Sequence, residues 1–183
     1  MVECEHMEQT PKPEHIISQR TIVYIRNLIF GVEDSLVSTV GLLSGVAAAG
    51  VPRSVIFLTG VVLIFVEAFS MGVGSFISEH AVEEYSKKEQ ADHSHTLIGG
   101  IIMFISYFIA GFIPLFPYLI LEVPNAFMLS IALSLLSLFL LGALSGKSFG
   151  IKIWARGVQM LVLGGIAIGL GVVVGVVVAR LQG

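Results

Sequence analysis

Hydrophobic residues occur in five long stretches of the chain, separated by short polar segments. The stretches cover residues 28–50, 54–78, 97–121, 126–146 and 157–179. Each is long enough to cross the hydrocarbon layer of a membrane as a helix, which takes about 20 residues. The alternating pattern of a membrane barrel strand is absent. The pattern therefore predicts an all-α integral membrane protein with five transmembrane helices.

The composition supports this class. Of the 183 residues, 55% are hydrophobic and only 13% are charged, whereas a soluble domain has about 25% charged residues. The net charge of −3, without a clustered basic face, argues against a nucleic-acid-binding protein. A single cysteine excludes an internal disulfide and a C-x-x-C zinc site. The stretches contain no nucleophile–base pair, so we expect neither an enzyme nor a resident cofactor.

The basic residues predict the orientation. Eight of the ten Lys and Arg fall on one side of the predicted helices, and only Arg53 and Arg180 fall on the other. The side richer in basic residues faces the cytoplasm, which places the N-terminus there. We expect a polar cytoplasmic tail over residues 1–15 and a five-span membrane domain over residues 16–183.

Residues 15–27 alternate apolar and polar side chains in a loose helical rhythm. Two interpretations remain open. The segment forms a helix that lies in the cytoplasmic interface, or the first transmembrane helix begins early.

Three acidic residues lie within the first two stretches, Glu33, Asp34 and Glu67. A carboxylate at the centre of a bilayer costs about 2.5–3.5 kcal/mol, so a function is expected for them. Asp34 lies 17 or 18 residues before the turn between the stretches, and Met71 lies 19 or 20 residues after it. At about 1.5 Å per residue, the two lie within about 3 Å of the same depth. Glu67 lies one helical turn before Met71, on the same face.

These side chains combine carboxylate oxygens with a thioether sulfur. Oxygen ligands alone suit Mg²⁺ or Ca²⁺, whereas the added sulfur favours Fe²⁺, Mn²⁺, Co²⁺ or a similar ion. Small residues over 70–75 permit close helix approach or a water-filled path. Alternatives stay open for three residues: Met71 only packs, Glu33 is solvated near the interface, and Glu67 is protonated and structural.

Three segments of the chain carry recognisable motifs: residues 31–39 (GVEDSLVST), 67–74 (EAFSMGVG) and 105–118 (ISYFIAGFIPLFPY). In this order they resemble the G-x-x-D-G-L-x-T signature, the A-D/E-x-x-S-M-x-x-G element and the G-x-x-P-L-x-P run of the vacuolar iron transporter family, which includes iron/manganese vacuolar carriers. With five stretches in the same order, the resemblance covers nearly all of residues 20–183.

The resemblance implies a dimeric, proton-coupled exporter that moves Fe²⁺, and often Mn²⁺, out of the cytosol. It implies an ion path at the dimer interface, with transport-site roles for Asp34 and Met71 and a neighbouring acid at Glu67. Proton coupling has a physical rationale. A bound ion stabilises ionised carboxylates, whereas the ion-free membrane interior favours their protonated form, so metal and proton compete for the same oxygens.

The chain departs from the family pattern in two ways. Ser35 and Ser75 replace a Gly and a Glu that are common in the family. Many members also carry a long Glu-rich helical domain between the second and third spans, whereas residues 79–95 predict only a short cytoplasmic loop. Glu79 and Glu83 share one face of an extension of the second helix and are candidate metal ligands for capture. The alternative is a solvated, charged loop.

Glycine pairs of the G-x-x-x-G type occur at Gly41 and Gly45, at 165/169 and at 171/175. Such pairs bring helices close together, within or between subunits. Because the first stretch also carries Asp34, we expect two copies of it to pack against each other in a homodimer.

We therefore expect a homodimeric bundle that exports Fe²⁺, with Mn²⁺ or a related ion as alternative cargo, in exchange for protons. Its partners are the ion, protons, the lipid bilayer and a second copy, and no nucleic acid. A prokaryotic protein of this kind would lie in the cell membrane, and a eukaryotic one in the vacuolar or another endomembrane. The alternative function is a non-transporting membrane metal sensor or assembly subunit.

Overall fold

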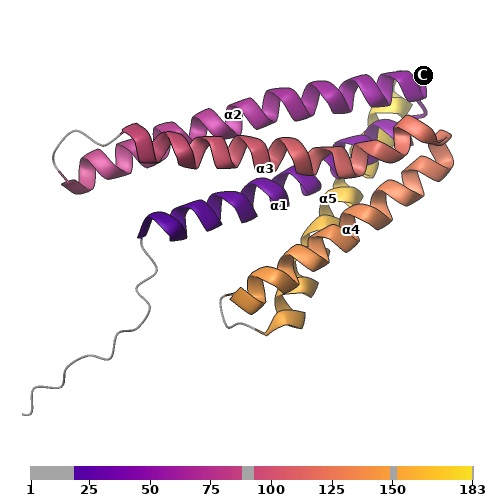
Figure 1. Cartoon of the computed structure of the whole chain (residues 1–183). Helices are drawn as coiled ribbons and strands as arrows, with labels where there is room; N and C mark the ends of the chain where they lie inside the picture. Colours follow the sequence, from indigo (N-terminus) through magenta and orange to yellow (C-terminus); the bar gives the residue numbers. More distant parts are fainter. Residues whose placement is uncertain (1–18, 88–92, 149–151, 183) are drawn as a thin grey trace, which may run out of the picture.

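The computed structural model describes residues 19–87, 93–148 and 152–182 (Figure 1). These ranges form five helices: α1 (Gln19–Ala48), α2 (Arg53–Lys87), α3 (His93–Ile120), α4 (Val123–Ser148) and α5 (Ile153–Gln182). All five are long and apolar enough to cross a membrane. The predicted all-α architecture with five membrane-spanning helices is thus confirmed. The tail over residues 1–15 and residues 88–92 of the expected loop lie outside the described residues.

The first three helices extend well beyond the apolar stretches. α1 already includes Gln19, so residues 19–27 belong to the first membrane-spanning helix rather than to a separate interfacial helix. α2 continues to Lys87 and α3 begins at His93, so most of the segment expected as a loop is helical. Hydrophobicity marks the part of a helix that lies in lipid, whereas the backbone hydrogen bonds of the helix continue into polar sequence.

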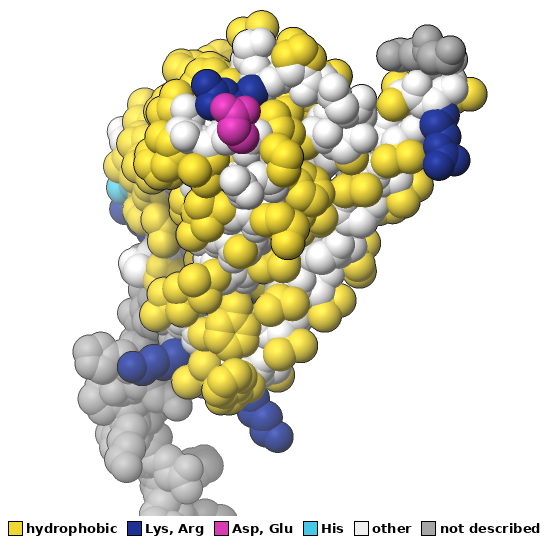
Figure 2. Space-filling model, turned by 90° about the vertical axis from the view of Figure 1, so that its right-hand side faces the viewer, with side chains coloured by type: hydrophobic (Ala, Val, Ile, Leu, Met, Phe, Trp, Pro, Cys, Tyr) yellow, Lys and Arg dark blue, Asp and Glu magenta, His cyan; other side chains and the backbone are white. Residues whose placement is uncertain are grey.

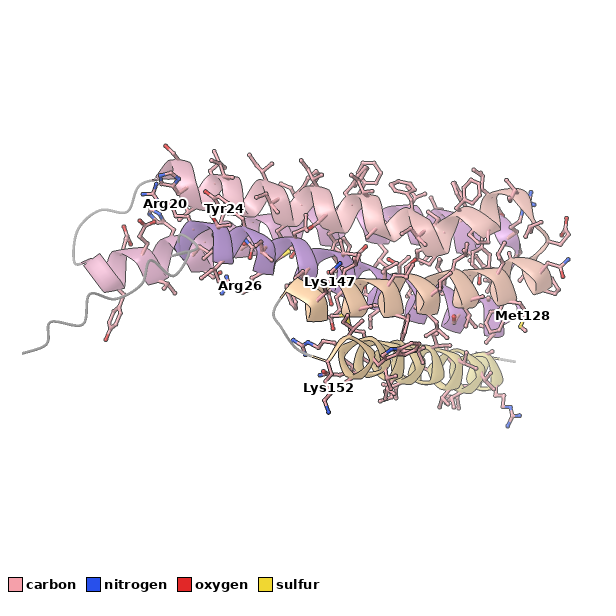
Figure 3. The ribbon with its side chains drawn as sticks, turned by 60° about the horizontal axis from the view of Figure 1, so that its bottom comes forward. Arg20, Tyr24, Arg26, Met128, Lys147 and Lys152 are labelled. Atoms are coloured by element: carbon pink, nitrogen blue, oxygen red, sulfur yellow. The ribbon has the colours of Figure 1, made fainter. Side chains whose placement is uncertain are left out.

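α1 is the central helix of the bundle, since it packs against α3 and α5 and also contacts α2 and α4. α2 and α3 run alongside α1, and α4 pairs with α5 (Figure 1). At one end the first three helices project beyond the α4–α5 pair (Figures 1 and 3). Arg20, Tyr24 and Arg26 lie on this projecting part, and Lys147 and Lys152 lie at the nearest ends of α4 and α5 (Figure 3).

Two clusters of buried hydrophobic side chains hold the helices together. One joins the four helices α1, α2, α3 and α4 and consists of Leu43, Ile56, Ile64, Leu115, Tyr118 and Ala126. The other joins α1, α3, α4 and α5 through Leu36, Ala110, Leu138 and Met160. Surrounding lipid is as apolar as these side chains, so the clusters stabilise the bundle by close van der Waals packing rather than by removal from water.

Glycines bring α1 and α5 into backbone contact. A Cβ atom at Gly45 would lie 2.5 Å from the carbonyl oxygen of Gly171, and one at Gly175 would overlap the carbonyl oxygen of Gly45. The Gly41–Gly45 pair therefore packs against α5 of the same chain. This contact lies within one chain, so the packing of two copies of the first helix against each other stays a prediction.

The outer surface is mainly hydrophobic. Figure 2 shows hydrophobic side chains over most of one face, with charged side chains confined to a few places. α5 is the least buried helix, and its exposed side chains include Ile166, Leu170, Val173 and Val177. Such a surface suits contact with lipid.

We predict that Gly175→Ala destabilises the protein and that Gly169→Ala does not. The methyl group added at Gly175 would overlap the Gly45 carbonyl oxygen, whereas one at Gly169 meets open space. Overpacking of this kind costs about 1–3 kcal/mol, which thermal unfolding of the detergent-solubilised variants would detect. Equal unfolding temperatures for the two variants would contradict the α1–α5 contact.

Candidate functional site

Small and polar residues line α1 where it faces α3. Asn27, Gly31 and Ser35 recur every four residues and so share one face of the helix. The Ser35 hydroxyl donates a 2.6 Å hydrogen bond to the carbonyl oxygen of Tyr107. A Cβ atom at Gly31 would lie 3.1 Å from the carbonyl oxygen of Met103. This close contact fixes how α1 is rotated about its axis and therefore where its acidic residues point.

Asp34 of α1 and Glu67 of α2 lie close enough for their charges to interact. Both side chains are partly buried. Tyr107 of α3 is fully buried and lies within electrostatic range of both carboxyl groups. Its hydroxyl is hydrogen-bonded to the Ser38 hydroxyl at 2.7 Å. The structure thus brings the two predicted acids together beside a tyrosine, while their role as metal ligands stays a prediction.

Glu33 has a different neighbour. Its carboxyl group interacts with the charge of Arg156, whose Nη1 donates a 2.9 Å hydrogen bond to Gln159 in the first turns of α5. Successive residues on a helix point about 100° apart, so Glu33 and Asp34 cannot both face α2. The structure therefore places Glu33 toward α5, apart from the Asp34–Glu67 pair.

Met71 lines an open groove of about 550 Å³, called the Met71 groove below. Its other lining residues come from all of the first three helices and are Arg26, Asn27, Phe30, Ser70, Gly74, Ser75, Ser78 and Met103. Met71 lies one helical turn from Glu67 on the same face of α2. The predicted sulfur ligand therefore lies in a groove one helical turn from Glu67, and neither Asp34 nor Glu67 is among the residues that line this groove.

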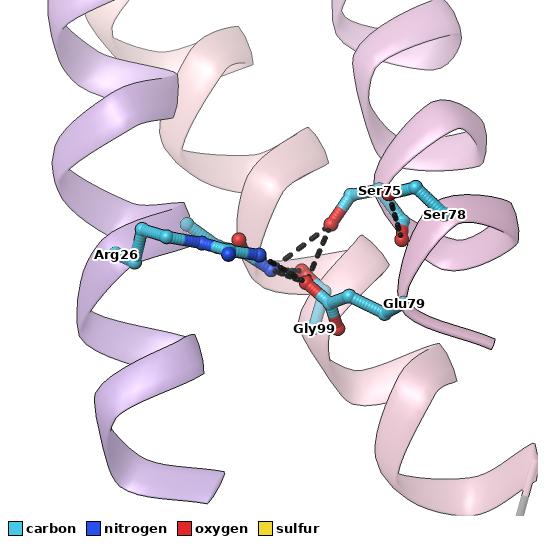
Figure 4. A network of polar contacts seen from close by, with 6 residues as sticks. Arg26, Ser75, Ser78, Glu79 and Gly99 are labelled. Carbon is cyan, nitrogen blue, oxygen red and sulfur yellow. Dashed lines mark hydrogen bonds and ion pairs between the residues drawn. The ribbon is translucent and has the colours of Figure 1, made fainter. Parts of the chain in front are cut away.

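Glu79 of α2 has polar contacts with two residues of α1 and with one residue of its own helix (Figure 4). Its Oε1 accepts hydrogen bonds from Asn27 Nδ2 at 2.5 Å and from Ser75 Oγ at 3.0 Å, and it pairs with the Arg26 guanidinium at 3.4 Å. A Cβ atom at Gly99 would overlap Glu79 Oε2, so the glycine provides the space for the carboxylate. Only 11% of the Glu79 side chain is exposed, so Glu79 is not a residue of a solvated loop.

The sequence prediction missed Asn27 and Ser75 as partners of Glu79. Ser75 carried a signal, because it is one of the two substituted positions at which the chain departs from the family motifs. Asn27 directly precedes an apolar stretch, and the sequence does not show whether other helices cover its side chain. Its side chain is 1% exposed, and a buried amide requires hydrogen-bond partners.

Glu83 lies one turn beyond Glu79 on α2. Both residues line a cavity of about 310 Å³ at the projecting end of the bundle, together with Arg20 and His95. The Tyr24 hydroxyl, in the same cavity, lies 3.5 Å from His95 Nδ1. The two acids thus share one face, as their spacing predicted, although basic side chains accompany them.

Within residues 19–87, 93–148 and 152–182, no three His, Cys, Asp or Glu side chains come together as a metal site. Among the candidate ligands, Asp34 and Glu67 interact with each other, and Glu79 and Glu83 line the same cavity. A complete ligand set for a divalent ion would therefore need other oxygen or sulfur donors, water, or a second copy of the chain.

Comparison with known proteins places this site in a wider context. A model of the VIT family matches residues 25–99 and 80–176. Vacuolar iron transporter 1 of Oryza sativa subsp. japonica is 20% identical over 203 residues, which covers 78% of this chain and 81% of that protein. Vacuolar iron transporter 1 of Tulipa gesneriana is 28% identical over 86 residues, which covers 44% of this chain and 35% of that protein. The family match includes the Asp34–Glu67 pair, the Met71 groove and Glu79.

Proposed function

The chain belongs to the VIT family, and we propose that it exports Fe²⁺ from the cytosol, to a vacuole or the cell exterior, in exchange for protons. Mn²⁺ is the alternative cargo. The family match and the similarity to two proteins named vacuolar iron transporter 1 support metal transport in general. The choice of ion, the direction and the proton exchange are the proposal.

The observation that carries the proposal is the Asp34–Glu67 pair. Both acids lie on helices able to cross a membrane, and their charges interact. Two adjacent carboxylates in such a place repel each other, and a divalent cation between them would neutralise both. Met71, one turn from Glu67, adds a sulfur donor that favours Fe²⁺ over harder ions such as Mg²⁺.

Proton exchange follows from the same pair of acids. Without metal, protonation relieves the repulsion between the carboxylates, and with metal bound both are ionised. Metal and proton therefore occupy the same oxygens alternately, which is the thermodynamic requirement for antiport. A proton gradient across the membrane would then drive metal out of the cytosol.

A homodimer would complete the site. The Met71 groove is open in one chain and carries hydroxyl groups of Ser70 and Ser75, and polar groups that face lipid are unfavourable. A second copy of the chain packed over this groove would cover them. Two-fold symmetry would then bring two copies of Asp34 and Met71 near one axis. The projecting end, with Arg20 and its basic neighbours, would face the cytosol.

The proposal is tested by ion flux into proteoliposomes that contain the purified protein. Fe²⁺, Mn²⁺, Co²⁺ and Zn²⁺ are compared side by side, and an internal pH dye records proton movement in the opposite direction. Flux of Fe²⁺ or Mn²⁺ with counter-movement of protons supports an antiporter. Metal binding without flux of any ion would favour a sensor or assembly subunit instead.

We predict that Asp34→Asn abolishes flux and leaves the thermal unfolding temperature close to that of the unchanged protein. The substitution keeps the size of the side chain and removes the charge that holds the ion. Glu33→Gln is the matched control, because this neighbouring acid faces Arg156 rather than Glu67, and it should retain most of the flux. Full flux in a correctly folded Asp34→Asn protein would remove Asp34 from the transport site.

We predict that Met71→Leu reduces the preference for Fe²⁺ over Mn²⁺. Leu keeps the volume of the side chain and removes only the soft sulfur donor. The ratio of Fe²⁺ to Mn²⁺ flux, measured in one preparation, reports this change. Met103→Leu, which removes the other sulfur of the Met71 groove, is the control. An unchanged ratio in Met71→Leu would show that the sulfur does not contact the ion.

We predict disulfide cross-links between subunits at the Met71 groove. Cys4 is the only cysteine, so Cys4→Ser provides a cysteine-free background. Ser70→Cys and Gly74→Cys, both in the groove, should cross-link in lipid vesicles. Leu136→Cys, exposed on α4, should not. A monomeric mass in lipid, without cross-links at either groove position, would contradict this dimer.

A further inference from the structure

Three oxygen atoms surround the side-chain nitrogen of Asn27. Glu79 Oε1 lies 2.5 Å from Asn27 Nδ2, Ser75 Oγ lies 2.9 Å away, and the carbonyl oxygen of Gly99 lies 3.1 Å away. These three oxygens come from α2 and α3 and meet where α1 packs against both (Figure 4). A side-chain amide has only two N–H groups. Three oxygens therefore converge on a group that offers two protons, so at least one of its hydrogen bonds is shared.

The three oxygens are a carboxylate, a hydroxyl and a backbone carbonyl. Carboxylate, carbonyl and water oxygens are the ligands that Mg²⁺, Ca²⁺ and Mn²⁺ prefer. A positively charged side chain already lies beside this cluster, because the Arg26 guanidinium is 3.4 Å from the same Glu79 oxygen. Glu79 thus accepts hydrogen bonds from the neutral donors Asn27 and Ser75 and pairs with the positive charge of Arg26.

The cluster lies between two cavities. Glu79 lines the cavity at the projecting end, which also contains Glu83, whereas Asn27 and Ser75 line the Met71 groove. Arg26 lines both. A cation that moves from the projecting end toward Met71 would therefore pass this cluster.

We propose that Glu79 Oε1, Ser75 Oγ and the Gly99 carbonyl oxygen form a staging site for a divalent cation. The cation enters by displacing the Asn27 amide nitrogen and the Arg26 guanidinium, and water completes its coordination. The route to Met71 rests on the proposed transport function, but binding at this site does not require that the protein transports metal. Because its ligands are all oxygens and none is sulfur, the site favours divalent ions that prefer oxygen ligands.

The test measures Mn²⁺ binding to the purified full-length protein in lipid nanodiscs, from the electron paramagnetic resonance signal of free Mn²⁺. All variants carry Asp34→Asn, which removes the proposed transport site. Glu79→Gln should abolish the remaining binding. Ser75→Ala, which removes one ligand, should weaken binding at least about tenfold. Ser78→Ala is the matched control, because its hydroxyl donates to the Ser75 carbonyl oxygen rather than to Glu79, and binding should be unchanged.

Arg26→Gln gives a change in the opposite direction. Removal of the competing guanidinium should tighten Mn²⁺ binding about two- to fivefold, the range for an exposed ion pair. The gain should disappear when Arg26→Gln is combined with Glu79→Gln. Unfolding temperatures of all variants are recorded so that only folded proteins are compared.

Two results would overturn the staging site. One is equal Mn²⁺ affinity in Ser75→Ala and Ser78→Ala, and the other is Arg26→Gln binding no tighter than its parent. Failure of the transport proposal looks different, since the protein without substitutions would then show no flux in proteoliposomes while Mn²⁺ binding still depended on Ser75 and Glu79.

Discussion

The close approach of α1 to two neighbouring helices is the constraint on which the rest of the structure depends. On one side the Gly41–Gly45 pair contacts α5 at the level of the backbone, and on another Gly31 and Ser35 contact α3. These contacts leave α1 a single rotation about its axis. That rotation directs Asp34 toward Glu67 and the preceding acid toward α5, so small residues decide where the charged ones can act.

The sequence predicts the features that depend only on the length of the apolar stretches and on the regular geometry of helices in a lipid bilayer. Five helices follow from stretches of sufficient length, because lipid leaves a spanning chain few other structures. The proximity of Asp34 and Glu67 follows from the rise per residue in an antiparallel pair of helices. The partner of Gly41 and Gly45 does not follow, because a G-x-x-x-G pair indicates a close contact but not which helix makes it.

Polar ends of helices are harder to predict, since hydropathy does not distinguish a charged helix from a charged loop. The sequence left open whether Glu79 lies on a helical extension or in a solvated loop. In the structure it is on α2 and bonded to Asn27, 52 positions earlier in the chain. Ser75 stands where the family pattern commonly has Glu. In the structure the Glu79 carboxylate lies 3.0 Å from the Ser75 hydroxyl. The carboxylate of Glu79, one turn further along α2, is thus close to the position where the family pattern commonly has the Glu side chain.

The proposed staging site and transport site would separate the recognition of charge from the recognition of metal type. The oxygens around Asn27 would accept any hard divalent ion, including abundant Mg²⁺, because nothing among them distinguishes a soft ion. Discrimination would then occur at the proposed transport site, where Met71 lies one turn from Glu67. In the proposed path, a cation bound only by charge could return to the cytosol, whereas one that also gained the sulfur contact would be held between two carboxylates. Selectivity would therefore arise after entry, at the position where metal and protons compete.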